Sequence, residues 1–227
     1  MVWGILGALD AEVALIRDKM DIAETTEMFG TTYYQGTVYG QQVVLVCCGV
    51  GKVNAAVCAA TAVSKFGAEC IVNVGIAGAM RPGLKIMDVV ISEQVAFHDQ
   101  DRIMLDYYPK CEFFQADEAL RTLCLTACAE IPALDHRVHT GLIISGDQFI
   151  NDAAVKKQLN ERYAPAATEM EGAAIGHAAF MFGVPFLVIR TMSDAADDDA
   201  DESYDNFIDD AAASSAGIIL KMLELSK

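Results

Sequence analysis

Basic residues are scarce in this sequence. Its 227 residues include 16 Lys and Arg against 32 Asp and Glu, so the formal net charge at pH 7 is -16. An acidic surface repels phosphate backbones and anionic lipid headgroups, which argues against nucleic acid or a membrane as a partner. The charge instead favours a neutral or cationic small ligand.

Cysteine pairs with CxxC spacing are also absent. The chain has 7 cysteines, an odd number, and most of them lie in apolar runs without any CxxC spacing. This pattern predicts reduced thiols in a cytosolic protein, with neither a disulfide framework nor a zinc site.

No leader or membrane anchor is predicted. The apolar residues 2–9 have no basic segment before them and are followed at once by Asp10, which does not fit a signal peptide. Residues 172–189 lack Asp, Glu, Lys and Arg, but Gly183 and Pro185 interrupt them. A helix, a tight turn and a buried strand explain this stretch better than a membrane span.

Apolar residues, by contrast, are abundant. They make up 53% of the chain, which is enough for a large buried core. The length suits one α/β domain better than two independent cores. Because no repeat, low-complexity linker or change of composition divides the sequence, we expect a single domain over residues 1–227.

Short apolar runs alternate with segments of helical periodicity along the chain. Strands are predicted at 3–8, 31–39, 42–48, 70–75, 88–97, 138–145 and 185–192. Helices are predicted at 10–20, 51–66, 117–131, 153–162, 171–182 and 207–225. Several strands are apolar on both faces, which is typical of parallel strands covered by helices. The predicted fold is therefore α/β, a three-layer α/β/α sandwich with a mixed, mainly parallel central sheet.

Ligands of such sheets bind beyond the carboxyl ends of the strands. Side chains that carry chemistry are therefore expected in the segments that follow the predicted strands. These segments are 9–12, 49–52, 75–78, 145–151, 169–171 and 193–194.

Two glycine-rich segments lack the spacing of nucleotide-binding motifs. Residues 49–52 (GVGK) would need a glycine at Val46 and a Ser or Thr at Val53 to form a phosphate-binding loop. Residues 75–78 (GIAG) do not match GxGxxG either. Both segments are better explained as glycine turns that let the backbone approach another group closely.

Other polar candidates have ordinary explanations. The acidic run 197–202 lacks the spacing and the glycine of an EF-hand, so a solvated loop is expected there. His98 and Asp99 fit a loop histidine beside a turn aspartate better than a catalytic pair, and His136 and His139 are expected to be exposed. We predict no metal site.

Three carboxylates, those of Glu12, Glu171 and Asp194, lie at the ends of apolar strands. Each has a structural explanation, because acidic residues favour helix starts and caps. Each also has a functional one, as a group that grips a ligand or as an acid whose pKa an apolar cleft raises. Three such residues at three strand ends favour the functional interpretation.

Seven segments, in order along nearly the whole chain, carry a family resemblance. They are GILGALDAEV (4–13), CGVGKVNAA (48–56), NVGIAGAM (73–80), FHDQD (97–101), GLIISGDQFIN (141–151), TEMEGAAIGH (168–177) and VPFLVIRTMSDAAD (184–197). The chain resembles the 5′-methylthioadenosine/S-adenosylhomocysteine nucleosidases, members of the purine nucleoside phosphorylase superfamily. The resemblance implies an enzyme without a cofactor that hydrolyses the N-glycosidic bond of 5′-substituted adenosines, releasing adenine and a free 5-substituted ribose.

The resemblance also implies catalytic roles for the three carboxylates. Asp194 matches the general acid that protonates N7 of adenine, and Ser193 matches the neighbour that orients it. Glu12 matches the base that activates water, and Glu171 the glutamate that holds the ribose hydroxyls. Glu169 is then expected to be structural.

Acid and base chemistry at one site requires environments that push two carboxyl pKa values apart. We therefore expect Glu12 to keep access to water and to hydrogen-bond donors, and Asp194 to lie in a drier pocket beside the purine.

Substrate-binding residues follow from the same resemblance. Met170 would pack under the sugar, Phe149 would stack on adenine, and the backbone of Ile150 would read the polar edge of the purine. Tyr204 would close over the sugar and the 5′ group.

The sequence departs from the family pattern at a few positions. Ile76 replaces a small hydroxyl residue, residues 79–80 (Ala-Met) replace Gly-Leu, and Leu9 replaces a methionine near the 5′ pocket. Residues 102–114, which the resemblance places at the 5′ pocket across a dimer interface, do not align readily with the family pattern. The resemblance thus implies a homodimer and leaves the preferred 5′ group open among methylthioadenosine, adenosylhomocysteine, 5′-deoxyadenosine and aminodeoxyfutalosine.

The related phosphorylases are an alternative within the same fold. They need cationic side chains for phosphate, whereas Asn73 stands where their pattern has an arginine, and Glu12 would repel an anionic nucleophile. Water is therefore the expected nucleophile. A futalosine-type nucleosidase and a catalytically silent nucleoside-binding protein stay open, although a pure binder would need neither an acid nor a base.

Overall fold

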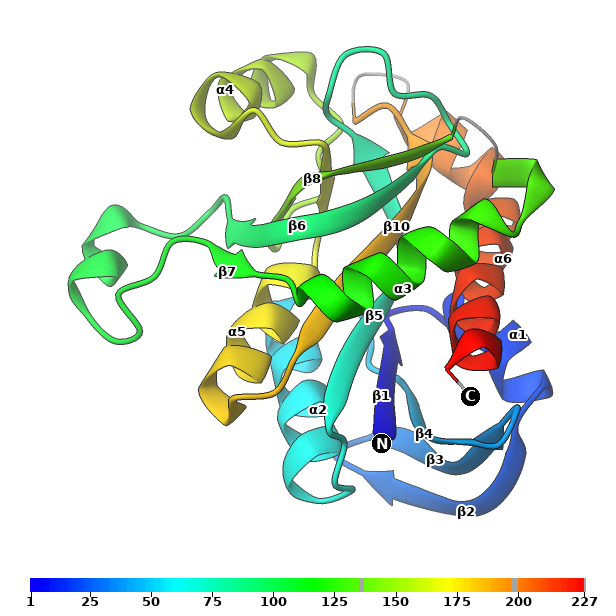
Figure 1. The fold of residues 1–227 in the computed structure, drawn as a ribbon. Helices are drawn as coiled ribbons and strands as arrows, with labels where there is room; N and C mark the ends of the chain where they lie inside the picture. Colours follow the sequence, from blue (N-terminus) through cyan, green and yellow to red (C-terminus); the bar gives the residue numbers. More distant parts are fainter. Residues whose placement is uncertain (135–136, 197–199, 227) are drawn as a thin grey trace.

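A computed structural model describes residues 1–134, 137–196 and 200–226 of the protein. One mixed β-sheet runs through it and carries helices on both faces (Figure 1). In the described residues the strands are β1 (Val2–Gly7), β2 (Asp21–Met28), β3 (Thr31–Val38), β4 (Gln41–Cys47), β5 (Cys70–Ala79), β6 (Val89–Phe97), β7 (Phe114–Gln115), β8 (Val138–Ser145), β9 (Ala167–Glu169) and β10 (Phe186–Asp194). The helices there are α1 (Asp10–Asp18), α2 (Lys52–Ser64), α3 (Glu118–Ala129), α4 (Ala153–Tyr163), α5 (Gly172–Phe182) and α6 (Ala200–Leu225), with 3-10 turns η1 (Arg102–Asp106) and η2 (Pro132–Leu134). The predicted α/β fold with a mixed sheet between helices is confirmed.

The sheet is ordered β10-β6-β8-β9-β5-β1-β4-β3-β2, with β7 beside β6. Parallel pairings join β4, β1, β5 and β10, and also β6, β8 and β9. An additional pairing of β10 with β5 closes the strands β5, β10, β6, β8 and β9 into a ring. The carboxyl ends of the parallel strands β1, β5 and β10 therefore lie together. β8 runs the other way, but its last residue, Ser145, pairs with Glu169 of β9 and so brings the end of β8 to the same place. The polar residues that follow these strands come within reach of one another.

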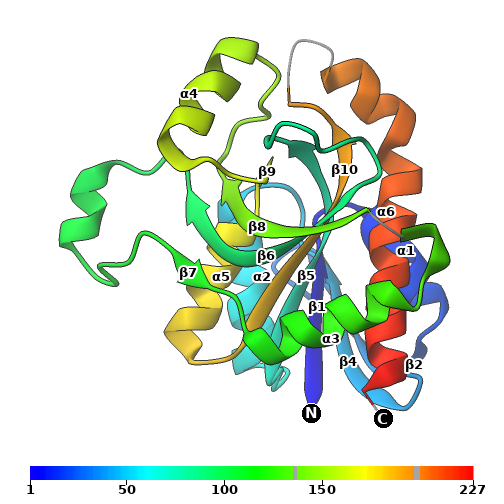
Figure 2. The same cartoon turned by 45° about the horizontal axis from the view of Figure 1, so that its top comes forward.

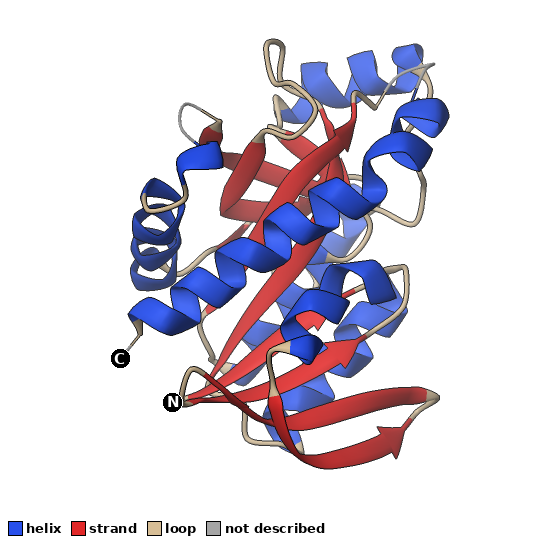
Figure 3. Ribbon diagram, turned by 90° about the vertical axis from the view of Figure 1, so that its right-hand side faces the viewer, coloured by secondary structure: helices blue, strands red, loops and turns tan. Residues whose placement is uncertain are grey.

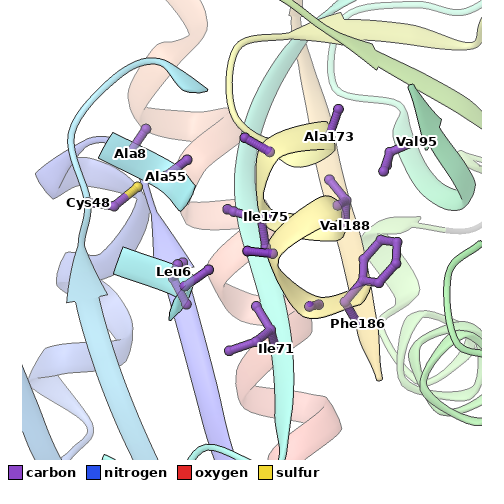
Figure 4. Close-up of a cluster of buried hydrophobic side chains, with 14 of the residues drawn as sticks. Leu6, Ala8, Cys48, Ala55, Ile71, Val95, Ala173, Ile175, Phe186 and Val188 are labelled. Carbon is purple, nitrogen blue, oxygen red and sulfur yellow. The ribbon is translucent and has the colours of Figure 1, made fainter. Parts of the chain in front are cut away.

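Alternating residues of the central strands pack into two separate cores, one on each face of the sheet. Ile5, Leu45 and Val72 pack with α1, α3 and α6 on one face of the sheet. Their neighbours Leu6 and Ile71 pack with α2 and α5 on the other face, as the close-up in Figure 4 shows. Figure 3 shows the resulting layers of helix, sheet and helix. The period of two in strand side chains explains why these apolar runs predicted buried strands.

The predicted hairpin between residues 31 and 48 is confirmed as β3 and β4. Tyr39 and Gly40 form its turn with φ of 51° and 85°, which suits the two-residue turns that match strand twist. β2 was not predicted, because its DIAETTEM sequence is polar and its residues are largely exposed. It is an edge strand beside β3, and charged residues are typical of such edges.

Several boundaries differ from the sequence prediction, all at the functional end of the sheet. Residues 75–78 are not a glycine turn, because β5 continues through them to Ala79. α6 begins at Ala200 rather than at residue 207, so the end of the acidic run is helical instead of a loop. Residues 197–199 of that run, and His136, lie outside the described residues.

α4 and the first turns of α6 flank the carboxyl end of β10 (Figure 2). The Lys156 ammonium of α4 donates to the backbone carbonyl of Ala195, which follows β10. This end of the sheet is therefore enclosed from two sides. Among the helices in the described ranges, not one has the length and apolar character needed to cross a bilayer.

Candidate active site

A cavity of about 380 Å³ lies at the carboxyl ends of β1, β5 and β10, beside the start of α5. Its walls come from seven separate segments of the chain. They are lined by Ala8, Leu9, Glu12, Val50, Ile76, Ala77, Gly78, Phe149, Thr168, Glu169, Met170, Glu171, Ser193, Asp194, Tyr204 and Asp205. The structure thus brings Glu12, Glu171 and Asp194 to one cavity, although they are far apart in sequence.

Glu12 lies in the first turn of α1 and is held by the backbone. Its Oε2 accepts the N–H groups of Ala8 (2.6 Å) and Leu9 (2.9 Å), and its Oε1 accepts the N–H of Ile76 (3.0 Å). The side chain is buried, and this burial raises the pKa of Glu12, although Arg190 and the three N–H donors act in the opposite direction. The hydrogen-bond donors expected around Glu12 are present. The expected access of Glu12 to water is absent, because Glu12 is as buried as Asp194, at 3% and 2% accessible surface.

Glu171 precedes α5 and is held by groups from two other elements. Its Oε1 accepts the N–H of Gly51 at 2.9 Å, and its Oε2 lies 3.7 Å from Arg190 Nη2. Burial, and then the nearby negative charge of Glu169, raise the pKa of Glu171 to about 7, against the pull of Arg190. Glu171 can therefore change its charge near neutral pH while it faces the cavity.

Glu169 lies at the centre of a buried network. Its carboxylate accepts hydrogen bonds from the Arg190 guanidinium and the Ser145 hydroxyl, and from the N–H groups of Glu171 (3.1 Å) and Gly172 (2.7 Å). The last two are unpaired N–H groups at the start of α5, so Glu169 caps that helix. It has the structural role that the sequence predicted, but as a buried ion pair rather than a surface charge.

Asp194 ends β10, just after an irregularity in its pairing with β5. Its Oδ2 accepts the Ser193 hydroxyl at 2.8 Å, and its Oδ1 accepts the N–H of Ala196 at 2.8 Å. These two contacts fix the plane of the carboxyl group at the cavity wall. The predicted pairing of Ser193 with Asp194 is present in the structure.

The remaining predicted residues surround the same space. Phe149 and Tyr204 meet edge to face, with ring centroids 5.6 Å apart, across the cavity lining. Met170, Leu9 and Ile76 also line the cavity.

Ile150 lines a small adjoining space together with Phe149, Met170 and Asp194. The apolar side chains therefore gather around the three carboxylates from the 145–151 segment, β5, the turn before α5, and α6. A polar centre within an apolar wall is typical of a small-molecule site.

Other polar residues of the sequence lie outside this cavity lining. Asn73 is buried and bonds Arg190 and the carbonyl of Leu6 instead. His98 is buried, whereas Asp99 pairs with Lys52, so the two do not form a catalytic pair. His139 was expected to be exposed, but it is half-buried, 3.4 Å from Asp88.

The described residues contain no group of side chains that could bind a metal ion. In residues 1–134, 137–196 and 200–226, no three or more His, Cys, Asp or Glu side chains are arranged to hold a metal ion.

Arg190 is the important residue that the sequence analysis missed. It is fully buried in β10 and contacts Glu169, Glu171 and Asn73. A lone arginine in an apolar strand was a usable signal, because a buried charge requires buried partners. Its partners could not be identified from the sequence, since Asn73 lies 117 positions away.

Comparisons with known proteins agree with this geometry. Residues 3–224 match the family model of the phosphorylase superfamily. A 5′-methylthioadenosine/S-adenosylhomocysteine nucleosidase of Exiguobacterium sp. is 38% identical over 223 residues, covering 96% of this chain and 95% of that protein.

Solved structures are similar over almost the entire chain. The corresponding nucleosidase of Neisseria meningitidis, in complex with methylthio-immucillin-A, has a TM-score of 0.94 at 33% identity and covers 99% of both chains. The futalosine hydrolase of Helicobacter pylori has a TM-score of 0.91 at 29% identity, covering 99% of this chain and 98% of its own.

Proposed function

The chain belongs to the 5′-methylthioadenosine/S-adenosylhomocysteine nucleosidases of the phosphorylase superfamily, and we propose that Glu12, Glu171 and Asp194 perform its reaction. The enzyme hydrolyses the N-glycosidic bond of 5′-methylthioadenosine and S-adenosylhomocysteine. Adenine and a free 5-substituted ribose are the products. The observation that carries the proposed mechanism is the convergence of the three carboxylates on one largely apolar cavity.

Asp194 is the general acid. Adenine is a poor leaving group as an anion, so a proton must reach its N7 as the C–N bond breaks. The Ser193 hydroxyl and the Ala196 N–H support this role, because they hold the Asp194 carboxyl in one orientation. Asp194 is also almost completely shielded from solvent at the cavity wall.

Glu12 is the base. It removes a proton from water, whose oxygen then forms the new bond to the anomeric carbon. The pKa of Glu12 is raised by burial, which strengthens it as a base, while three N–H donors stabilise the ionised form that it needs before the reaction. Water therefore meets a fixed carboxylate rather than a mobile one.

Glu171 binds the ribose hydroxyls. As the bond to adenine breaks, the sugar acquires positive charge, and an adjacent carboxylate stabilises it. Gly51 and Arg190 hold the two oxygens of Glu171 in place. Met170 then packs under the sugar, while Phe149, the backbone of Ile150 and Tyr204 take the purine and the 5′ side.

Water is favoured over phosphate as the nucleophile by the charges at the site. The cavity wall carries the carboxylates of Glu12, Glu169, Glu171, Asp194 and Asp205, whereas Arg190 lies behind Glu169 and Glu171 and outside the lining. A phosphate dianion that entered the cavity would meet these carboxylates before it reached Arg190. Asn73 adds no cationic contact.

Futalosine hydrolysis is the second candidate. It is favoured by the similarity to the Helicobacter pylori futalosine hydrolase, since both reactions cleave an N-glycosidic bond with water. The two differ in the 5′ group, and the identity of the Exiguobacterium nucleosidase favours the methylthio and homocysteinyl groups.

The remaining proposals concern the protein as a whole. We propose that residues 1–227 act as one nucleosidase domain in the cytoplasm, in methionine salvage, and as a homodimer. An apolar groove between α2 and α5, lined by Val53, Val57, Phe97, Met181 and Phe182 among others, supports the dimer.

Product analysis tests the proposed function. The purified enzyme is given methylthioadenosine, adenosylhomocysteine, 5′-deoxyadenosine and aminodeoxyfutalosine, each with and without phosphate. We expect adenine and a reducing sugar from the first two at a rate that phosphate does not change. A sugar 1-phosphate would contradict the hydrolase, and preference for the futalosine substrate would support the second candidate.

A further inference from the structure

A cluster of three charged residues lies beside the cavity, outside its lining. The Lys52 ammonium donates to Asp99 Oδ2 at 2.6 Å and lies 3.3 Å from Asp147 Oδ2. Asp147 Oδ1 accepts the N–H of Lys52 at 2.9 Å, and Asp99 Oδ2 accepts the N–H of Asp147 at 3.0 Å. We refer to Lys52, Asp99 and Asp147 as the Lys52 cluster.

The Lys52 cluster joins three segments that follow three different strands. Lys52 begins α2 after β4, Asp99 follows β6, and Asp147 follows β8. Two of these segments carry groups of the candidate active site. The 145–151 segment carries Phe149 at the cavity wall, and the residue before Lys52 donates its N–H to Glu171.

This connection is more than a surface ion pair. Exposed ion pairs stabilise proteins by only about 0–1 kcal/mol, but here both aspartates also accept backbone N–H groups from the neighbouring segments. The side chains of Lys52 and Asp99 are 24% and 18% exposed. Burial raises the pKa of Asp99, yet the hydrogen bonds from Lys52 and the Asp147 N–H outweigh it and lower that pKa overall.

The backbone at this junction is equally constrained. Gly51 has φ of 100°, which side chains disfavour, and a Cβ there would lie 3.3 Å from Asp147 Oδ1. The N–H of Gly51 therefore reaches Glu171, and the N–H of Lys52 reaches Asp147, from one rigid turn.

We propose that Lys52 is a positioning residue for the reaction, which sets the distance between the purine-binding Phe149 and the ribose-binding Glu171 by clamping Asp99 and Asp147. This inference rests on the roles of Phe149 and Glu171 in the proposed function. Lys52 itself does not touch the substrate. Its loss separates the two halves of the binding site while every substrate contact residue stays present.

The variant Lys52→Met tests the proposal, because Met keeps the apolar stem and removes the charge. A displacement of about 1 Å can cost an enzyme about 10²-fold, so we expect kcat/KM for methylthioadenosine to fall between about 10- and 100-fold, mainly through KM. The affinity for adenine alone should fall as well. Lys52→Arg keeps the charge and can still bond both carboxylates, so it should retain most of the native kcat/KM and of the native affinity for adenine.

Lys157→Met is the matched control, because Lys157 on α4 is 78% exposed and pairs only weakly with Glu161 at 3.9 Å. The oligomeric state of each variant is measured by sedimentation, so that an effect on assembly is recognised. A Lys52→Met enzyme with native KM and kcat, or one that differs from the native enzyme only in assembly, would overturn the proposal.

A double-mutant cycle with Phe149→Ala separates the inference from the proposed function. If Lys52 acts through the 145–151 segment, kcat/KM of the double variant should be little lower than that of the more impaired single variant. Losses that multiply would show that Lys52 acts independently of Phe149, against the proposal. A Phe149→Ala variant with native KM would instead contradict the purine contact in the proposed function.

Discussion

The proposed general acid, Asp194, depends on its position at the cavity wall. It combines two fixed hydrogen bonds with almost complete burial at the cavity wall. The cavity also offers a carboxylate without these features, that of Asp205, which lies on the exposed side of α6. Asp205 is therefore a matched control for the proposed acid, Asp194.

We expect Asp194→Asn to lower kcat by about 10²–10⁴-fold, because an amide cannot deliver the proton that a general acid supplies. Substrate affinity should change far less, since shape and hydrogen-bonding capacity are mostly kept. Steady-state kinetics and calorimetric binding measure the two effects, with Asp205→Asn as the control. Near-normal turnover by Asp194→Asn would remove this residue from the mechanism.

Glu169 and Glu171 are two positions apart and have different surroundings. Glu169 pairs with the buried Arg190, whereas Glu171 faces the cavity with its pKa raised to about 7. From the sequence, Glu169→Gln would cost about 1 kcal/mol or less, as expected of a charge that only complements a helix start. The buried ion pair changes that expectation, since breaking such a pair typically costs about 3–5 kcal/mol.

We therefore expect Glu169→Gln to lower the free energy of unfolding by about 3 kcal/mol or more, and also to move the acid limb of the kcat/KM profile to lower pH. The second effect follows because the negative charge of Glu169 raises the pKa of Glu171. Urea unfolding and a pH–rate profile measure the two effects. A stability loss with an unmoved profile would show that Glu169 does not influence the charge of Glu171.

Among the elements, β5 passes close to both proposed reacting groups. A Cβ at Gly75 would lie 2.8 Å from Glu12 Cδ and 3.1 Å from Arg190 Nη1, and one at Gly78 would lie 2.7 Å from Asp194 Oδ1. The glycines of GIAG do permit a close approach, as the sequence predicted. They do so as part of a strand, and the groups that approach are the proposed base and acid.

We expect Gly75→Ala to displace the Glu12 carboxylate and to lower kcat/KM by about 10²-fold, the cost typical of a 1 Å misplacement. Gly217→Ala in α6 is the control, because a Cβ there meets no atom within 4 Å. That control should raise stability by about 0.5–1 kcal/mol with unchanged kinetics, since Ala is the better helix former. Full activity in Gly75→Ala would contradict the assigned position of the base.

At the scale of the whole molecule, the cost of burying carboxylates makes stability depend on pH. The pKa of Glu171 rises from 4.5 to about 7 on folding, chiefly through burial. The folded state therefore holds a proton that the unfolded state releases, so this contribution is complete below pH 4.5 and is lost as pH rises through about 7. His98 and His177, whose pKa values burial lowers from 6.5, give the opposite slope below pH 6.5.

Comparing the native protein with Glu171→Gln isolates the contribution of Glu171, because the two histidines and Glu12, whose pKa burial also raises, contribute in both proteins. We expect the free energy of unfolding of the native protein, relative to that of Glu171→Gln, to fall as pH rises from 4.5 to about 7. Urea denaturation at several pH values measures it. Glu161→Gln, at a side chain that is 67% exposed, is the control and should keep the native pH dependence, and the same native pH dependence in Glu171→Gln would contradict the assignment.

Local patterns in the sequence predicted most of the secondary structure and the residue types of the candidate site. Apolar runs on both faces predicted β1, β4 and β10, and helical periodicity predicted α2 and α5, because these patterns are local. Carboxylates at the strand ends identified the proposed acid, the base and the ribose ligand as candidates. β2 and the start of α6 escaped prediction, because their polar sequences carry no such local pattern. β7 and β9 escaped it because two or three residues are too few to show one.

How those residues act together depends on contacts that the fold creates between distant parts of the chain. The burial of Glu12, the ion pair of Glu169 with Arg190, and the clamp of Lys52 on Asp99 all join residues from different elements. These contacts exist because β10 pairs with β5 and closes the ring of strands, and no local pattern specifies that pairing. A carboxylate's pKa depends on the charges and solvent around it, and in this protein the fold brings those surroundings together from across the chain.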